Sequence, residues 1–275
     1  MTIYPFTIHL GSLAITGFGL MMMFAFLVAG WIMRIDLKER GLNEHYSGDI
    51  VVAAVIGGII GAKLWYVVLT RDPAALFTRG GLVWYGGFLG GVIAVLINGA
   101  RHRVPARWTM QVVGPALAAS YAVGRVGCLL VGDDYGGPST LPWAMKFPEG
   151  LPPSTVASLQ EFGVRVPDGL APDTVLAVHP TQIYETLIML AVFAFMWSRR
   201  RAPGGTGWIF GVYLMFAGAE RFLVEILRAK DDRFVGPFTI AQVTSLVVFV
   251  VGAVVYARLK PAPAAEPGEY LARAG

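Results

Sequence analysis

Three basic residues lie inside long apolar stretches of the sequence, namely Lys63, Arg125 and Arg221. A cation near the centre of a bilayer costs at least about 2.5 to 3.5 kcal/mol, so each should face a protein interior and have an anionic partner. The acidic residues inside such stretches are Glu185, Glu220 and Glu225. Arg221 and Glu225 are four residues apart, which places them on one helix face and permits a direct ion pair. An excess of positive groups converging from several helices suits an anionic lipid headgroup, whereas the alternative is that these charges only neutralise one another.

Three further polar clusters stand where apolar stretches begin or end. The segment 80–87 (GGLVWYGG) sets an aromatic pair among four glycines, which indicates a backbone that bends or that lets a helix or a ligand come close. The segment 124–136 (GRVGCLLVGDDYG) combines a buried arginine with two acids at a helix exit, which is typical of a polar site at the membrane surface. The segment 179–185 (HPTQIYE) begins a helix, and its His179 is either a site residue or a simple helix cap.

The elements that carry these clusters are those of a membrane protein. The chain has 275 residues, of which 55% are apolar and only 15% charged, and its mean hydropathy is +0.60. Soluble domains carry about 25% charged residues, so this composition indicates an integral membrane protein. The formal charge of +4 does not indicate nucleic-acid binding, because no basic cluster is interleaved with stacking aromatic residues. The single cysteine, Cys128, excludes an intrachain disulfide and a multi-thiolate metal site.

Apolar stretches of about 17 to 25 residues predict an all-α fold with seven transmembrane helices. The predicted helices are 16–33, 50–70, 82–99, 110–131, 181–198, 206–227 and 238–257. Lys and Arg are most frequent in the loops that are cytoplasmic if the N-terminus is outside and the C-terminus inside, so this topology is preferred. No Lys or Arg precedes Arg34, so the first stretch lacks the basic region of a cleaved signal peptide and should remain in the mature protein.

The predicted domain organisation has one membrane domain, residues 1–260, and a short tail. Residues 1–15 should lie at the membrane interface. The segment 132–180 is rich in Pro and Gly and too polar to span, so it should form a small extracytoplasmic subdomain or lid. The tail 261–275 (PAPAAEPGEYLARAG) has the composition of a disordered cytoplasmic segment.

The three clusters, in this order and followed by RFLVE at 221–225, resemble the prolipoprotein diacylglyceryl transferase family. The likeness covers nearly the whole chain, and the segments 124–136 and 179–185 are its specific parts. It implies a multi-pass enzyme of the bacterial inner membrane with no cofactor and no metal. The implied reaction moves diacylglyceryl from phosphatidylglycerol, a membrane lipid, to the lipobox cysteine in the signal peptide of a prolipoprotein. A thioether forms and glycerol 1-phosphate leaves.

The resemblance also implies roles for particular residues. Arg125 and Arg221 match the family's phosphate-binding arginines, and Lys63 is a second-rank headgroup contact. The implied catalytic residues are Tyr85, Arg125, Arg221, Glu225, His179 and Asp133. The implied substrate contacts, besides the two arginines, are Lys63, Gly136, Gly86, Gly87, Cys128 and Phe18.

Several residues depart from the family pattern. Tyr85 stands at the histidine of the family's HGG motif, the residue usually proposed as the base that deprotonates the thiol. Cys128 replaces a signature asparagine, Asp133 a glutamate, and Phe18 and Ala217 replace tyrosines. A phenol with a pKa of about 10 is a poor base at neutral pH. The phosphate half of the site is therefore retained, and the half that activates the thiol is altered.

These departures leave alternatives open. Either His179 or Asp133 takes over as base, or Tyr85 acts as a neighbour of the thiolate beside Arg125. Cys128 could be read as a nucleophile, but the family chemistry needs no enzyme thiol, so we expect a small buried residue. A divergent paralogue that binds phosphatidylglycerol without this transfer is the second interpretation. A transporter is the third, disfavoured because the intramembrane charges form no relay across the bilayer.

Overall fold

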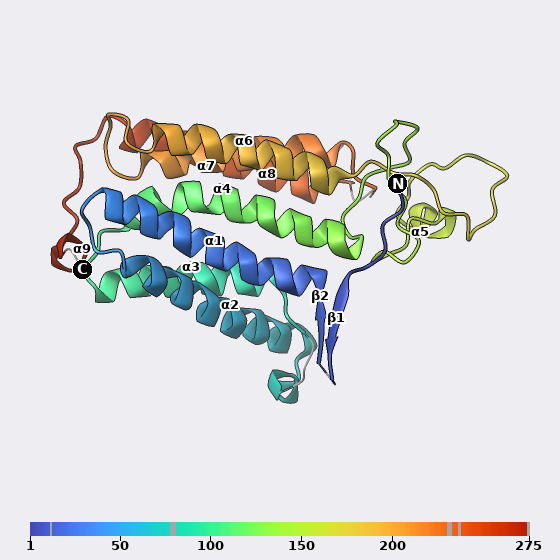
Figure 1. Cartoon of the computed structure of the whole chain (residues 1–275), viewed down its shortest axis with the longest axis horizontal. Coiled ribbons are helices and arrows are strands. Elements are labelled where there is room, and N and C mark those ends of the chain that lie inside the picture. Colours follow the sequence, from blue (N-terminus) through green and yellow to red (C-terminus); the bar gives the residue numbers. More distant parts are fainter. Residues whose placement is uncertain (12, 78–80, 230–232, 236–237, 274–275) are drawn as a thin grey trace. The chain divides into compact units, whose positions relative to one another are not determined.

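The computed structural model describes the whole chain except residues 12, 78–80, 230–232, 236–237 and 274–275 (Figure 1). Its long helices are α1 (Gly17–Glu39), α2 (Tyr46–Thr70), α3 (Trp84–Arg101), α4 (Ala106–Val131), α6 (Thr181–Arg199), α7 (Trp208–Glu225) and α8 (Ile240–Leu259). Each of the seven predicted stretches thus coincides with a helix, and the bounds differ by a few residues. The fold is mostly helical, as predicted.

Five of these helices, α1, α2, α4, α6 and α8, are long and apolar enough to cross a membrane. The other two, α3 and α7, have 18 residues each. α7 contains Glu220, Arg221 and Glu225, and these three charges lower its suitability as a span exposed to lipid. Several membrane-crossing helices are therefore present, and the number seven stays a prediction.

The short elements lie between and before the long helices. Strands β1 (Thr7–Leu10) and β2 (Leu13–Thr16) form an antiparallel hairpin in which Thr7 pairs with Thr16. The sequence analysis expected only an interfacial segment there and missed this hairpin. The remaining elements are η1 (Pro73–Phe77), α5 (Val156–Glu161), β3 (Arg233–Val235), β4 (Phe238–Thr239) and α9 (Glu269–Ala272).

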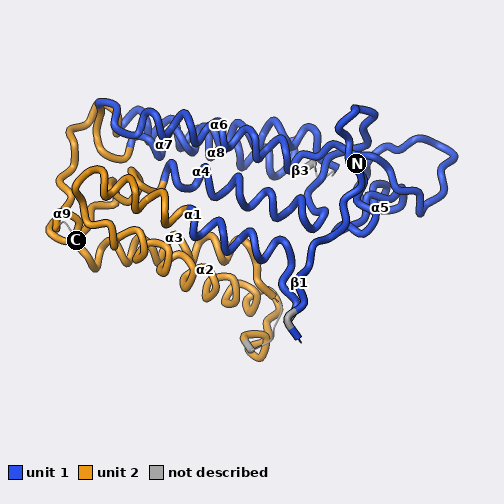
Figure 2. Tube along the Cα trace, in the orientation of Figure 1, with its two compact units in different colours: residues 1–28, 114–203, 208–258 blue, residues 29–113, 204–207, 259–275 orange. Residues whose placement is uncertain are grey.

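The chain divides into two compact units (Figure 2). Unit 1 comprises residues 1–28, 114–203 and 208–258, and unit 2 comprises residues 29–113, 204–207 and 259–275. This division does not follow the predicted boundary at residue 260, because the tail belongs to unit 2. It also divides α1 and α4 between the units.

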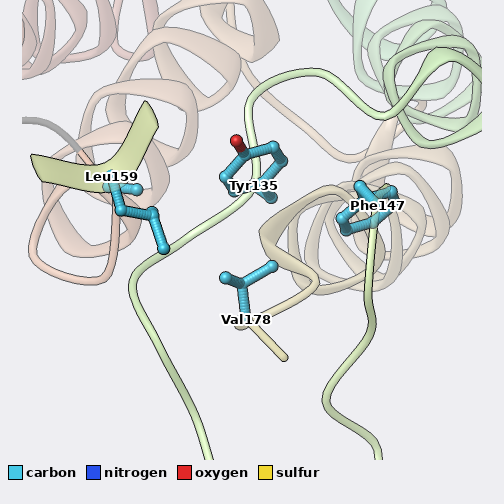
Figure 3. Close-up of a cluster of buried hydrophobic side chains, with 5 residues drawn as sticks. Tyr135, Phe147, Leu159 and Val178 are labelled. Carbon is cyan, nitrogen blue, oxygen red and sulfur yellow. The ribbon is translucent and has the colours of Figure 1, made fainter. Parts of the chain in front are cut away.

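Within unit 1, the segment 132–180 supplies most of a separate hydrophobic cluster (Figure 3). The cluster contains Tyr135, Phe147, Leu159, Val178 and Ala229, all buried. The rings of Tyr135 and Phe147 stack with their centroids 5.4 Å apart. The Tyr135 hydroxyl donates to backbone carbonyls of two consecutive prolines at 2.9 Å each. The one polar group of this buried ring therefore has hydrogen-bond partners. The segment is therefore folded and packs against Ala229, which lies outside it, and its role as an extracytoplasmic subdomain or lid stays a prediction.

Within unit 2, glycines bring the backbones of α2 and α3 into contact. A Cβ atom added at Gly61 would lie 2.2 Å from the carbonyl oxygen of Gly86. One added at Gly90 would lie 2.3 Å from the carbonyl oxygen of Gly57. Spacings of four residues between small residues on each helix are the usual means of close helix packing in membranes.

The tail was predicted to be disordered, and the structure differs. Leu271 of α9 is fully buried, and the Trp108 indole donates to the carbonyl of Ala265 at 2.9 Å. The Tyr270 hydroxyl donates to Asp49 Oδ2 at 2.5 Å, and this hydrogen bond raises the pKa of Tyr270 to about 12. The composition of the tail did not reveal that Leu271 and Tyr270 pack it against the rest of unit 2.

Candidate active site

Arg125 is the centre of a charged network in unit 1. It lies near the C-terminal end of α4, and its side chain is only 12% exposed. Its Nε donates to Glu185 Oε2 on α6. Its Nη1 donates to Asp134 Oδ2 at 2.8 Å. The guanidinium is therefore held by two carboxylates from separate segments, in the charge-assisted geometry that binds arginine most strongly.

Two further arginines complete this network. Arg221 Nη2 lies 2.5 Å from Glu225 Oε2, so the ion pair predicted from their spacing is confirmed. Arg228 pairs with Asp134 Oδ1, and its Nη1 lies 3.8 Å from Glu225 Oε2. Asp134 therefore bridges Arg125 and Arg228. We call these residues and Glu185 the arginine network.

The expected excess of unpaired positive charge is not found among the described residues. Arg125, Arg221 and Arg228 each have at least one carboxylate partner. The sequence analysis counted only charges inside the apolar stretches, and Asp134 lies just beyond the end of α4. One donor is left over, because within the described part of the chain nothing accepts a hydrogen bond from the buried Nη1 of Arg221.

The acidic pair that follows α4 brings two of the predicted clusters together. Asp134 has a backbone φ of 61°, in the left-handed region. Its carbonyl accepts a hydrogen bond from Thr181 Oγ1 at 2.6 Å, and the carbonyl of Asp133 accepts one from Gln182 Nε2 at 2.6 Å. The turn after segment 124–131 is thereby fixed to the start of α6, the segment that contains the HPTQIYE sequence.

The two neighbouring carboxyls differ electrostatically. Burial by itself would raise the pKa of Asp134, but the charges of Arg228 and Arg125 outweigh it and lower that pKa. For Asp133, burial and then the charge of Asp134 raise the pKa. Asp133 is therefore the better proton acceptor of the two, since a carboxylate whose pKa is raised binds a proton more readily.

Gly136 permits close packing of three chain segments. Its N–H donates to the carbonyl of His179 at 2.8 Å. A Cβ atom at this position would lie 2.5 Å from the carbonyl oxygen of Leu227 and 2.8 Å from the Cβ of His179. The structure thus gives this glycine a packing role, and its predicted contact with substrate stays a prediction.

His179 and Cys128 have different surroundings. The ring nitrogen Nδ1 of His179 lies 3.4 Å from the Tyr184 hydroxyl, which in turn accepts a hydrogen bond from the Trp143 indole at 2.8 Å. The ring is thus engaged with aromatic neighbours. Cys128 is buried, as expected, and its Sγ lies 3.4 Å from Arg125 Nη1.

Phe18 lies where α1 packs against α4. A Cβ atom added at Gly127 of α4 would be 3.2 Å from the Cα of Phe18 and 3.1 Å from the Cβ of Met21. The Phe18 side chain itself is exposed. The structure therefore explains Gly127 by helix packing and leaves the role of Phe18 open.

The remaining predicted residues, Tyr85, Lys63, Gly86 and Gly87, belong to unit 2. The Tyr85 side chain is 57% exposed, and the Lys63 ammonium lies 6.0 Å from the centroid of the Tyr66 ring. Gly86 contacts α2 through its backbone. Of the alternatives given for the glycines of segment 80–87, close approach of a helix therefore explains this one. Gly80, at the start of that segment, lies outside the described residues.

Comparison with known proteins agrees with the arrangement of these clusters. A profile of the prolipoprotein diacylglyceryl transferase family matches residues 5–258. The chain belongs to this family.

Relatives in this family cover nearly the whole chain. A protein of Cupriavidus metallidurans is 32% identical over 268 residues, which are 91% of this chain and 91% of that protein. A protein of Clostridium tetani is 29% identical over 260 residues, 92% of this chain and 96% of that protein. Both are named phosphatidylglycerol–prolipoprotein diacylglyceryl transferase.

The arginine network also contains residues that the sequence analysis did not count among the catalytic or substrate-binding residues. Asp134, Glu185 and Arg228 all form ion pairs with residues of the predicted site. The Tyr121 hydroxyl, one helical turn before Arg125, contacts Glu185 Oε2 at 2.9 Å. Spacing could have found Tyr121, since residues four apart share a helix face. No sequence signal indicates that Asp134 folds back onto two arginines.

Proposed function

We propose that the chain transfers diacylglyceryl from phosphatidylglycerol to the lipobox cysteine of prolipoproteins, forming a thioether and releasing glycerol 1-phosphate. The family profile over residues 5–258 and the names of the relatives support this reaction. The observation that carries it is Arg125, a buried arginine of a membrane-crossing helix, held in a fixed orientation by carboxylates. A guanidinium fixed in this way presents a planar fork for a phosphate.

The proposed setting is the bacterial inner membrane. We infer seven spans with the N-terminus outside and the C-terminus inside, in a membrane domain of residues 1–260. The segment 132–180 is then an extracytoplasmic lid or subdomain. The helix at each predicted stretch, the five apolar helices and the bacterial source of the relatives support this arrangement.

In the proposed site, Arg125 and Arg221 bind the phosphodiester of the lipid. Glu225 orients Arg221, whose Nη1 has a hydrogen to donate and no acceptor among the described residues. Asp134 is shared by Arg125 and Arg228, so a phosphate that takes its place would engage both guanidinium groups. Lys63 would add a weaker contact, because an ammonium lacks the bidentate fork.

The transfer step balances without a cofactor. The thiolate of the lipobox cysteine attacks the glyceryl carbon that bears the phosphate, so that a C–S bond forms and a C–O bond breaks. The electron pair of the C–O bond leaves with the phosphate of glycerol 1-phosphate, where the two arginines stabilise the charge. The thiol proton passes to a base.

For that base we favour Asp133 over His179 and Tyr85. Asp133 has a raised pKa and adjoins Asp134 of the arginine network. His179 contacts Tyr184 instead, and the phenol of Tyr85 has too high an ordinary pKa. In unit 1, Gly136 and Cys128 then shape the site without taking part in proton transfer, and substrate contacts of Phe18, Gly86 and Gly87 stay predictions.

A divergent paralogue that binds phosphatidylglycerol without transferring it is the second candidate. Two observations favour it. Tyr85 stands at the family's base position, and every arginine of the network already has a carboxylate partner. Both candidates require the phosphate site, so only turnover separates them.

The test is transfer in detergent from phosphatidylglycerol to a synthetic lipobox peptide, with the product detected as a peptide heavier by one diacylglyceryl group. We expect product with the natural chain and a loss of at least about 100-fold in Arg125→Gln. Arg165→Gln is the matched control, because Arg165 is an exposed residue of segment 132–180. Equal rates in Arg125→Gln and the natural chain would refute the assignment, and binding without product in the natural chain would favour the paralogue.

A further inference from the structure

The hydroxyl of Tyr121 lies between two buried glutamates of unit 1. It is 2.9 Å from Glu185 Oε2 on α6 and 3.4 Å from Glu220 Oε2 on α7. Glu185 is fully buried and Glu220 is 3% exposed. The second oxygen of each carboxyl, Oε1, is also buried and has no hydrogen-bond partner among the described residues. Two carboxyl groups thus face one phenol in a place with little water.

A count of protons shows what this arrangement requires. A phenol has one proton to donate and otherwise only accepts. The shorter contact and the ion pair with Arg125 make Glu185 the acceptor of that proton and the ionised member. Glu220, in contrast, forms no ion pair within the described part of the chain. If it were ionised, its oxygen would face the phenol oxygen without a proton between them, and its buried charge would have no direct ion-pair partner among the described residues.

We propose that Glu220 carries a proton in the resting protein and that Glu220 and Tyr121 are positioning residues for Arg125. Protonated Glu220 donates to the Tyr121 oxygen, Tyr121 donates to Glu185, and Glu185 accepts from Arg125 Nε. The chain of hydrogen bonds fixes the guanidinium from one side and leaves Nη1 toward Asp134. The protonation of Glu220 does not depend on the proposed function. Its effect on lipid binding rests on that function.

Because charged and titratable groups surround Glu220, its protonation sets the net charge beside Arg125. They are Tyr121 and Arg125 of α4, Glu185 of α6, and Arg221 and Tyr213 of α7 itself. With Glu220 neutral, the charges of Arg125 and Glu185 cancel, and Arg125 still has a donor for a phosphate. Loss of the proton adds a negative charge beside Arg125, which weakens the affinity for an anionic phosphodiester on the order of tenfold.

The first experiment locates the proton without reference to activity. Infrared spectra of the full chain in detergent are recorded for the natural protein and for Glu220→Gln, and the difference should contain the C=O stretching band of a protonated carboxylic acid. Glu149→Gln is the control, because Glu149 is an exposed residue of segment 132–180, and it should leave that band in place. Tyr121→Phe should keep the band and shift its frequency, since the acid loses its acceptor. A band that persists in Glu220→Gln, or no band at all, would overturn the proposal.

The second experiment measures the consequence. The KM for phosphatidylglycerol and the kcat of transfer are followed between about pH 6 and 9, a range in which buried glutamates can lose their proton. In the natural protein KM should rise by about tenfold toward high pH, while in Glu220→Gln it should stay at its low-pH value. Thermal stabilisation by added phosphatidylglycerol gives the same profile as a binding measurement and needs no turnover.

The outcomes separate this inference from the proposed function. Absence of transfer in every variant, with lipid binding that becomes independent of pH in Glu220→Gln, refutes the transferase and supports the positioning role. Normal transfer with identical pH profiles in the natural protein and in Glu220→Gln supports the transferase and refutes the positioning role. Loss of transfer in Glu220→Gln at every pH would also refute it, because Glu220 would then act in its ionised form.

Discussion

The arginine network of unit 1 and the helix pair α2–α3 of unit 2 use their sequence clusters in opposite ways. In unit 1, the cluster is built from side chains that reach one another, and each guanidinium of the network has at least one carboxylate partner. In unit 2, it depends on side chains that are absent, since glycines let two backbones touch. A charge can be replaced together with its partner, but a backbone contact tolerates no added atom. The two regions should therefore respond differently to substitution.

The largest effect is expected in unit 1, where loss of a charge can be separated from loss of stability. Arg125→Gln leaves Glu185 as a buried carboxylate without its cation, which should cost about 3 to 5 kcal/mol of stability and abolish transfer. Adding Glu185→Gln removes the uncompensated charge, so the double variant should regain most of the thermal stability and none of the transfer. Melting temperature and transfer rate are measured on the same preparations. Recovery of transfer in the double variant would show that Arg125 has only a structural role.

In unit 2 the next largest effect should follow from one added methyl group. Gly61→Ala places a Cβ atom against the carbonyl of Gly86, and α2 and α3 must separate, at a cost of about 1 to 3 kcal/mol. Gly58→Ala is the matched control on the same helix, because its Cβ would meet the nearest atom at an ordinary 3.6 Å. Melting temperatures should fall for Gly61→Ala alone. Equal melting temperatures would mean that the backbones of α2 and α3 do not touch in the protein.

Acidification should act on the network and not on the helix pair. The folded pKa of Asp134 is lowered, so its contribution to stability is present above the unfolded value of about 3.9 and is lost as pH falls through the folded pKa. Asp134→Asn should therefore destabilise the protein by about 1 to 3 kcal/mol at neutral pH and remove that loss on acidification.

Asp133→Asn should change stability at neutral pH in the opposite direction, and the variant should be the more stable protein. The pKa of Asp133 is raised, so its ionised form costs stability at neutral pH and the amide removes that cost. Chemical denaturation at several pH values measures both variants. A destabilised Asp133→Asn would contradict the assignment of unlike environments to these two neighbours.

The smallest effect is expected at Tyr85, the exposed residue of unit 2 that stands at the family's base position. If the thiol reacts as thiolate formed in solution and not through Asp133, the natural rate should rise with pH toward the thiol pKa of about 8.5. Tyr85→His should raise the rate severalfold near neutral pH and flatten that rise, because an imidazole titrates there. A pH-rate profile with one lipobox peptide is the measurement. No transfer by the natural chain or by Tyr85→His at any pH from about 6 to 9 would favour the lipid-binding paralogue, in which Cys128, Phe18 and Ala217 also remain altered.

The length of the apolar stretches predicted the helices, because a stretch of about 20 apolar residues has few other structures in a membrane. The Arg221–Glu225 pair and the buried Cys128 also followed from local spacing and residue type. The double role of Asp134 did not, since it depends on a left-handed backbone at one residue after α4. The contact between Tyr121 and Glu220 was missed for a similar reason. Spacing can place Tyr121 on the helix face of Arg125, but it does not show how α4 and α7 pack, and the contact depends on that packing.

The composition of unit 2 has a consequence for biosynthesis. Asn43 donates two hydrogen bonds to backbone carbonyls of α9, from its N–H to Leu271 and from its side-chain amide to Tyr270, and Leu271 fills a buried position there. Residues 29–113 are made before α6, α7 and α8, but the α9 residues that complete their packing are made only after those three helices. The first-made half of the protein must therefore wait in the membrane with part of its packing surface open, and a ribosome stalled before residue 271 holds an unfinished unit 2.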